Sequence, residues 1–293
     1  MIEAAVQLER AAAAAHRVSD FVTVERVARQ LLELGESFGD RSAKAWGFYY
    51  LGVALNGLNR TGEALTATRS ALALFESFGD TLVAARVMMN LAAIELDNNL
   101  NVAEARRLYE AGEPGIRASG EPRRIAIALG NLGEIHRLEG DYAGALRRGL
   151  ESLAIFISVD DGSNAAWQTI DVAHYQSLLR DIPAAIESLH GARELLTRNP
   201  DPRWIAWYLD TWAMVAAKLG RWEIVAQLFA FTDRYRNENS QPRLQAMLPW
   251  LSEPKEQVSR KFSLERLDEL TLAGEALTLE QIQALVETIT VNP

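Results

Sequence analysis

Small side chains recur along this chain at a nearly constant spacing, and this repeat limits the possible folds more than any other feature. Starting from Gly133 and moving in steps of about 40 residues, every position reached holds a small residue. These positions are Ala12, Gly52, Ala92, Ala173 and Ala213. A second series, twelve or thirteen residues behind the first, consists of Val24, Ala64, Ala105, Ala145, Ala185 and Val225. This spacing predicts an array of stacked helix-turn-helix repeats.

The boundaries of the repeats follow from helix-ending and helix-starting residues. The phrase at 36–40 returns unchanged at 76–80; its glycine suits a helix end with positive φ, and its aspartate suits the cap of the next helix. Ser19 or Asp20 can cap the helix over 21–34 in the same way. The six repeats span 2–34, 41–78, 80–119, 121–159, 162–198 and 202–235. We therefore expect an all-α fold, a right-handed α-solenoid of about six helix pairs.

The small residues have a specific place in this fold. In the first helix of each pair, the position held by Gly52 or Gly133 lies on the apolar face that packs against the second helix. A small side chain there, and another at Ala64 or Ala145 in the partner helix, lets the two backbones approach closely. A larger residue at either place is expected to cost about 1–3 kcal/mol of stability by overpacking.

The repeat pattern ends near residue 235, and the remaining chain has a different character. A polar turn over 236–242 precedes helices predicted near 244–251 and 262–271. Thr278 and Gln281 form a capping-box pattern that starts the last helix. We expect a repeat array over 1–235 and capping helices over 236–293.

The repeat resembles the tetratricopeptide repeat (TPR). Leu132-Gly133, Asp141-Tyr142 and Ala145 stand where that motif expects them, and the resemblance covers about residues 1–235. The period of about 40, compared with 34 in the common repeat, is similar to a long-repeat subclass. That subclass occurs in bacterial peptide-sensing regulators, in cell-polarity adaptors and in MalT-like sensor domains.

The segment from about 226 to 281 resembles the end of the helical domain in bacterial STAND and LuxR-type signalling ATPases. In those proteins a leucine-threonine-leucine-glutamate phrase, here Leu277–Glu280, closes the repeat domain. The family carries an NTPase module and usually a DNA-binding helix-turn-helix. This chain has no GxxxxGK[ST] phosphate loop. The resemblance therefore implies a sensor or partner module, with an NTPase or DNA-binding module on the same or a neighbouring chain.

We expect ligand contacts on the face of each first helix that lines the concave side of such arrays. In related long-repeat proteins an asparagine on this face holds the main chain of an extended peptide. Successive repeats here place Tyr50, Asn90, Asn131, Asp171 and Thr211 in the corresponding slot. The predicted groove comprises Trp46, Tyr49, Arg86, Asn90, Asn131, Glu134, Trp167, Asp171, His174, Trp207 and Thr211. The alternative is that the polar groups bond to neighbouring helices and the tryptophans only pack between repeats.

Composition narrows the classes of ligand and compartment. The formal net charge is −9, and acidic and basic residues balance in the groove slots, which disfavours nucleic acid and anionic membranes. The chain has no cysteine, which excludes a disulfide or a thiolate nucleophile. Neither a signal peptide nor a membrane span is recognisable. We expect a soluble, cytoplasmic protein without a cofactor that binds a peptide, a protein segment or a small effector.

Catalysis is not predicted. The four histidines are scattered over three repeats, and neither an H-E-x-x-H metal motif nor a G-x-S-x-G elbow is present. Glu134 and His174 occupy equivalent slots of adjacent repeats, where the expected interaction is an ion pair. The Lys and Asn clamp of chaperone-tail-binding repeats is replaced by Tyr49 and Val53. We expect a non-catalytic binding module, with a self-associating structural scaffold as the alternative.

Overall fold

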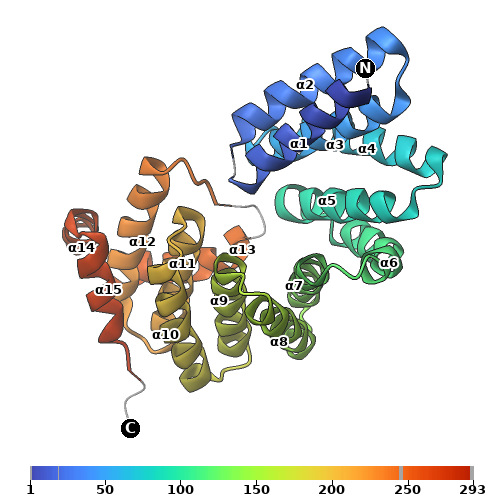
Figure 1. The fold of residues 1–293 in the computed structure, drawn as a ribbon. Helices are drawn as coiled ribbons and strands as arrows, with labels where there is room; N and C mark the ends of the chain where they lie inside the picture. Colours follow the sequence, from blue (N-terminus) through green and yellow to red (C-terminus); the bar gives the residue numbers. More distant parts are fainter. Residues whose placement is uncertain (1, 19, 244–246, 291–293) are drawn as a thin grey trace. The chain divides into compact units, whose positions relative to one another are not determined.

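The computed structural model describes residues 2–18, 20–243 and 247–290, and within these ranges the regular structure is entirely helical. Six antiparallel helix pairs follow one another along the chain and precede three further helices (Figure 1). The expected all-α solenoid is thereby confirmed. By compactness the chain divides into two units, Met1–Glu121 and Pro122–Pro293, here called unit 1 and unit 2.

Unit 1 contains the first three helix pairs. Their helices are α1 (Ile2–Arg17), α2 (Phe21–Phe38), α3 (Arg41–Gly57), α4 (Thr61–Phe78), α5 (Thr81–Asn99) and α6 (Val102–Ala118). The second and third pairs match the repeats predicted from the sequence to within one or two residues at each end. The local periodicity was therefore sufficient to locate these helices.

Unit 2 contains the last three pairs and the C-terminal helices. The pairs are α7 (Pro122–Leu138), α8 (Tyr142–Ser158), α9 (Gly162–Leu178), α10 (Ile182–Arg198), α11 (Pro202–Lys218) and α12 (Trp222–Glu238). The helices that follow are α13 (Leu248–Lys261), α14 (Leu264–Ala276) and α15 (Leu279–Glu287). The first helices of the pairs, α7, α9 and α11, carry the face on which ligand contacts were predicted.

Aspartate side chains cap seven of the fifteen helices in the described residues, as the sequence indicated for the helices after Asp20, Asp40 and Asp80. Asp40 accepts hydrogen bonds from the backbone N–H groups of Ser42 and Ala43, and Asp80 accepts one from Val83. The same role belongs to Asp20, Asp141, Asp161, Asp181 and Asp201. Ser19, the other predicted cap of α2, lies outside the described residues. Gly39 and Gly79 end α2 and α4 with φ of 66° and 73°, values that a glycine adopts without strain.

The two series of small residues form the seams inside the helix pairs. Ala12, Ala92, Ala173 and Ala213 are all completely buried, as are all six residues of the second series. A Cβ atom added to Gly133 would lie 3.3 Å from the carbonyl oxygen of Ala145 in the partner helix. The predicted close approach of the paired backbones is confirmed.

The C-terminal helices differ in extent from the prediction. The first was expected to end at 251 but α13 continues to Lys261, because Leu251 and Val258, two turns apart, are both buried on one face. Residues 244–246 of the predicted helix lie outside the described residues. The second was expected over 262–271, but Ser263 caps it and it runs to Ala276. The capping box of Thr278 and Gln281 is confirmed.

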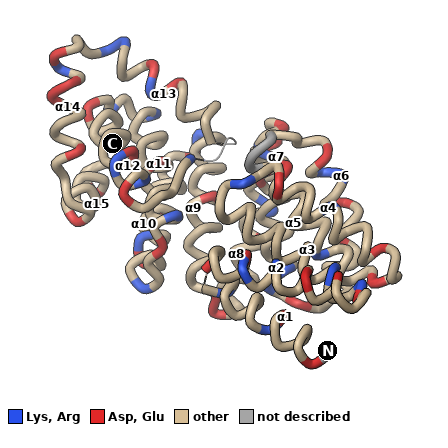
Figure 2. Tube along the Cα trace, turned by 90° about the horizontal axis from the view of Figure 1, so that it is seen from above, with Lys and Arg blue, Asp and Glu red and all other residues tan. Residues whose placement is uncertain are grey.

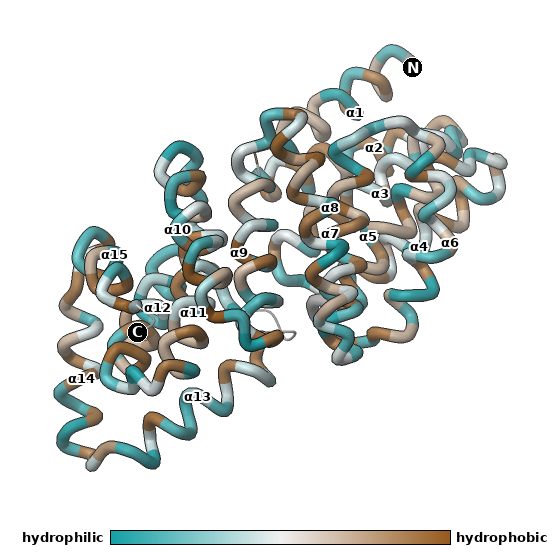
Figure 3. The backbone as a smooth tube through the Cα atoms, turned by 90° about the horizontal axis from the view of Figure 1, so that it is seen from below, coloured by the Kyte–Doolittle hydropathy of each residue, from teal (hydrophilic) through white to brown (hydrophobic). Residues whose placement is uncertain are grey.

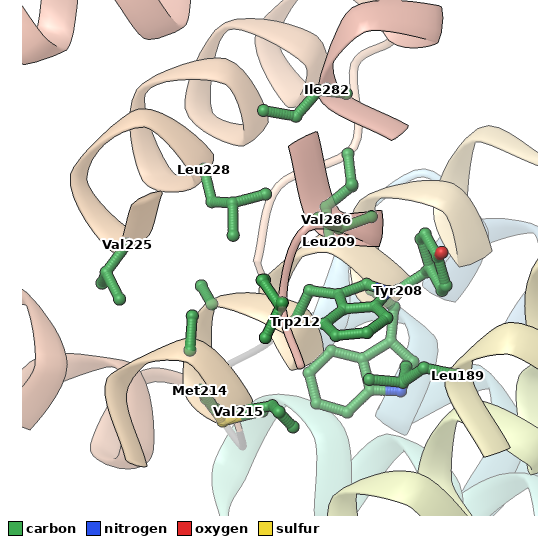
Figure 4. Close-up of a cluster of buried hydrophobic side chains, with 14 of the residues drawn as sticks. Leu189, Tyr208, Leu209, Trp212, Met214, Val215, Val225, Leu228, Ile282 and Val286 are labelled. Carbon is green, nitrogen blue, oxygen red and sulfur yellow. The ribbon is translucent and has the colours of Figure 1, made fainter. Parts of the chain in front are cut away.

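The core of unit 2 continues from the helix pairs into these C-terminal helices. Ile282 and Val286 of α15 face Leu228 of α12 and Trp212 of α11 (Figure 4). A Cβ atom on Gly274 of α14 would lie only 2.5 Å from the carbonyl oxygen of Gln227, so α14 packs very closely on α12. Hydrophobic and hydrophilic stretches alternate along each helix, consistent with one buried face (Figure 3). Among the described helices, none combines the length and apolar character that a membrane crossing demands.

Candidate ligand-binding site

Unit 1 brings together all four of its predicted groove residues. Trp46 lies on α3 and Arg86 on α5, and the Arg86 guanidinium carbon is 5.7 Å from the ring centroids of both Trp46 and Tyr49. Asn90 follows Arg86 by one helical turn and is partly exposed. In the ranges that the structure covers, Arg86 Nε is buried and has no hydrogen-bond partner. Burial raises the pKa of the nearby Glu9 carboxyl, and the charge of Arg86 partly opposes this rise.

In unit 2 the predicted residues separate into two groups. Trp167 stacks on Trp204 of α11, with ring centroids 5.8 Å apart, and its ring also meets Phe156 of α8. This arrangement packs one helix pair against the next. The second group lies deeper, where Trp207 Nε1 donates a hydrogen bond of 2.8 Å to Asp171 Oδ1. The contacts of Trp167 therefore follow the packing alternative.

The remaining polar groups of the predicted slot are differently placed. Asn131 is partly exposed on α7. Thr211 is fully buried, and its hydroxyl donates to the Trp207 carbonyl oxygen in its own helix. The expected ion pair between Glu134 and His174 is wrong, because both carboxylate oxygens of Glu134 accept hydrogen bonds from Arg137. Arg137, and not His174, is the partner of Glu134, because Arg137 lies one turn further along the same helix.

Trp250, which the sequence analysis did not select, covers this second group. Its ring stacks on His174 with centroids 4.0 Å apart, and it meets the Trp207 ring edge-on at 4.8 Å. The guanidinium carbon of Arg137 lies 4.8 Å from the Trp250 ring centroid. The predicted inner face of unit 2 therefore holds a segment of the same chain, α13. The available signal was a tryptophan within the apolar run Ala246–Leu251 beyond the repeats, since such a large apolar ring is usually buried.

A buried charge cluster holds Arg243 and connects the last helices of unit 2. Asp210 of α11 is completely buried and accepts 2.8 Å hydrogen bonds from Arg236 Nη2 and Arg243 Nη2. Arg243 also pairs with Asp233, which in turn accepts a 3.2 Å bond from Lys255 of α13. The cluster thus ties α11, α12 and α13 together.

His174 is the least satisfied polar group of the site. Only 1% of the residue is exposed, and neither ring nitrogen has a hydrogen-bond partner within the described part of the chain. Burial holds the pKa of the imidazole well below its ordinary value of 6.5, and the positive charges of Arg137 and Lys218 act in the same direction. The ring is therefore neutral at physiological pH.

This neutral imidazole predicts a pH-dependent stability. Below pH ~6.5 the unfolded chain binds a proton at His174 that the folded chain excludes, so stability falls as pH decreases, by up to ~1.4 kcal/mol per pH unit. Denaturant unfolding at pH 7.5 and 5.5 measures the effect. Because six of the seven tryptophans lie in unit 2, their fluorescence reports mainly on that unit. His174→Phe should unfold with a shallower pH dependence, and an unchanged dependence would contradict the assignment.

Comparison with known proteins identifies the class of fold. No protein-family model matches the chain, and no curated protein is significantly similar in sequence. Solved structures of TPR-like repeat proteins do match. The apo form of RapI has a TM-score of 0.59 at 13% identity, with 87% of this chain and 99% of RapI covered.

Two further structures give the same result. A STAND protein with a tetratricopeptide repeat sensor from Pyrococcus horikoshii has a TM-score of 0.55 at 13% identity, and the match covers 92% of this chain but 38% of that protein. The TPR-like repeats of a putative kinesin light chain from Podosopora anserina have a TM-score of 0.51 at 14% identity, with 66% and 96% covered. The chain therefore has a TPR-like α-solenoid fold.

Proposed function

We propose that this chain is a non-catalytic binding module that recognises a peptide or protein segment on the inner face of its helix pairs. The observation that carries the proposal is the seating of α13 on that face in unit 2. Trp250 is held there by stacking on His174 and by the guanidinium of Arg137. The same face thus has the chemistry needed to hold a polypeptide segment with an aromatic anchor.

Unit 1 offers a comparable set of side chains for a partner. Arg86 lies over Trp46 and Tyr49, and Asn90 beside it provides both a donor and an acceptor for a peptide backbone. The buried Arg86 Nε, which lacks a partner among the described residues, can donate to an incoming carbonyl oxygen. In unit 2 we propose the same ligand-facing role for Asn131, Glu134, Asp171, His174, Trp207 and Thr211 when α13 is displaced.

The wider role that we propose is the cytoplasmic sensor or partner-recognition part of a bacterial signalling or transcription regulator. The TPR-like fold, shared with RapI and with the sensor of a STAND protein, supports this assignment. An NTPase or DNA-binding module on the same or a neighbouring chain would then respond to the binding of a partner by this module. Acidic and basic residues are interspersed along the helices of each unit, which favours a protein partner over nucleic acid (Figure 2).

Arg86→Ala and Asn90→Ala are expected to weaken peptide binding at least about tenfold each, since each removes hydrogen bonds worth about 1.4 kcal/mol. Peptides selected from a displayed random library on the immobilised protein serve as probes, and fluorescence anisotropy measures their affinity. Arg107→Ala is the matched control, because Arg107 is exposed on α6 and its ion pair among the described residues is with Glu104 of its own helix. Unchanged affinity in both inner-face variants, with helicity intact, would refute the proposed face.

A further inference from the structure

A cleft of about 470 Å³ lies inside unit 2, between α9, α11, the start of α12 and α13. Its volume is within the range of about 300–1,000 Å³ that is typical of small-molecule sites. The apolar part of the wall includes Met214, Trp222 and Trp250, and the polar part includes His174, Lys218 and Lys261. Because α13 provides Trp250 and Lys261, the cleft exists only when α13 is seated on the inner face.

His174 indicates that the cleft is built for a polar ligand atom. Buried polar atoms in folded proteins are nearly always hydrogen-bonded, and both nitrogens of this buried ring lack a partner in the residues that are described. The ring is held in place by the stacked Trp250 and the edge-on Trp207. A neutral imidazole presents one N–H donor and one acceptor nitrogen. A ligand that accepts a hydrogen bond from this N–H would satisfy the donor.

The charges around the cleft favour an anion. Lys218 ends α11 and makes no ion pair with any described residue, yet its charge acts on the His174 ring. Lys261 lies with its ammonium 5.1 Å from the Trp222 ring centroid. Glu253, exposed on α13, is the one acidic residue among the described cleft-lining residues. Two ammonium groups against one carboxylate leave the cleft positive, and the tryptophan rings provide an apolar surface beside them.

We infer that this cleft binds a carboxylate attached to an apolar body. The carboxylate accepts a hydrogen bond from the neutral His174 and pairs with Lys218, while the apolar body lies against Trp222 and Trp250. The ligand bridges α9 and α11 to α13, so its binding stabilises the seated position of α13. This inference rests on the proposed function, because it assigns a ligand class to part of the same inner face.

The carboxylate can come from a small organic acid or from the C-terminal residue of a peptide, and the experiment separates these sources. Decanoate, 3-phenylpropionate and indole-3-acetate form one set of probes, each compared with its primary amide. The tripeptide Ala-Leu-Phe with a free or an amidated C-terminus forms the other. Calorimetric titration of the full chain measures binding. Saturable binding of an acid or of the free tripeptide, at least about tenfold tighter than its amide, is expected.

Two variants locate the bound carboxylate. His174→Phe keeps an aromatic ring against Trp250 but removes the donor, and Lys218→Met removes the charge while keeping most of the side-chain length. Each is expected to weaken binding at least about tenfold. Arg260→Met is the matched control, since Arg260 is exposed on α13, pairs with Glu256 of its own helix and does not line the cleft. Melting temperatures of the unliganded variants show whether each has folded.

The inference is overturned if no probe binds at millimolar concentration, if the amides bind as tightly as the acids, or if folded His174→Phe retains full affinity. Its failure can be separated from failure of the proposed function. Peptide binding that depends on Arg86 and Asn90 would still support the inner face as a peptide-binding surface. Loss of that dependence with acid binding retained would remove the peptide proposal alone.

Discussion

Replacing Asp210 by alanine is expected to lower the free energy of unfolding of unit 2 by about 3–5 kcal/mol, the typical loss when one partner of a buried ion pair is removed. Asp210 is completely buried, and the side chains of Arg236 and Arg243 that bind it are only 7% and 12% exposed. Without the carboxylate, the guanidinium groups of Arg236 and Arg243 would remain poorly hydrated, and less negative charge would balance their positive charges.

The same substitution should also release α13. Arg243 is the nearest described residue before the segment that leads into α13, and it spans 33 positions of sequence to reach Asp210. We therefore expect faster hydrogen exchange in α13 and altered fluorescence of Trp250 as it leaves His174. Denaturant unfolding followed by tryptophan fluorescence measures the stability loss. Glu269→Ala is the control, because its pair with Arg266 is exposed and worth at most about 1 kcal/mol. Equal effects of the two variants would contradict the role of Asp210.

The second large effect is expected from Gly52→Ala in unit 1, with a loss of about 1–3 kcal/mol through overpacking. A Cβ atom at this position would meet Thr68 Oγ1 on α4 and would lie 3.2 Å from the Thr68 backbone nitrogen. The Thr68 hydroxyl already donates a 2.8 Å hydrogen bond to the Ala64 carbonyl oxygen, which limits its freedom to turn away. The added methyl group must therefore push α3 and α4 apart.

Gly191→Ala is the matched control for Gly52→Ala. Gly191 is also inside a helix, α10, but no described atom lies within 4 Å of its added Cβ. Alanine has the higher helix propensity, so this variant should gain up to about 1 kcal/mol. Hydrogen exchange resolved by helix measures each change in its own unit. If both variants gain stability, the seam between α3 and α4 is less tightly packed than the structure indicates.

Much of the fold could be predicted because its determinants are local. Helix periodicity, the aspartate caps and the glycines at positive φ act over a few residues. Asp40, Gly79 and the Thr278 capping box were therefore recognisable from the local order of residues in the sequence. The limits of α13 and α14 were less predictable. Leu251 and Val258 extend α13 by packing on other helices, and such contacts override local preference.

The candidate site was predictable only in part. In unit 1 the helical phase of α3 and α5 was enough to bring Trp46, Tyr49, Arg86 and Asn90 to one face. In unit 2 the helical periodicity placed Asp171, His174 and Trp207 correctly on α9 and α11. It did not predict that Trp250 of α13 would contact two of them. Neither the stacking of Trp250 on His174 nor the bonds from Arg236 and Arg243 to Asp210 follows a repeat. Whether these residues contact a ligand stays a prediction.

The amino-acid sequence by itself determined the succession of paired helices and the small residues in their seams, because a spacing of about 40 residues places equivalent side chains at equivalent points of every pair. Only the tertiary structure decided which groups the inner face of unit 2 meets. A helix that folds back from beyond the repeats places Trp250 against the rings of Trp207 and His174 but leaves the nitrogens of His174 unbonded within the described residues. Such pairings depend on the three-dimensional approach of segments distant in sequence, which local periodicity does not encode.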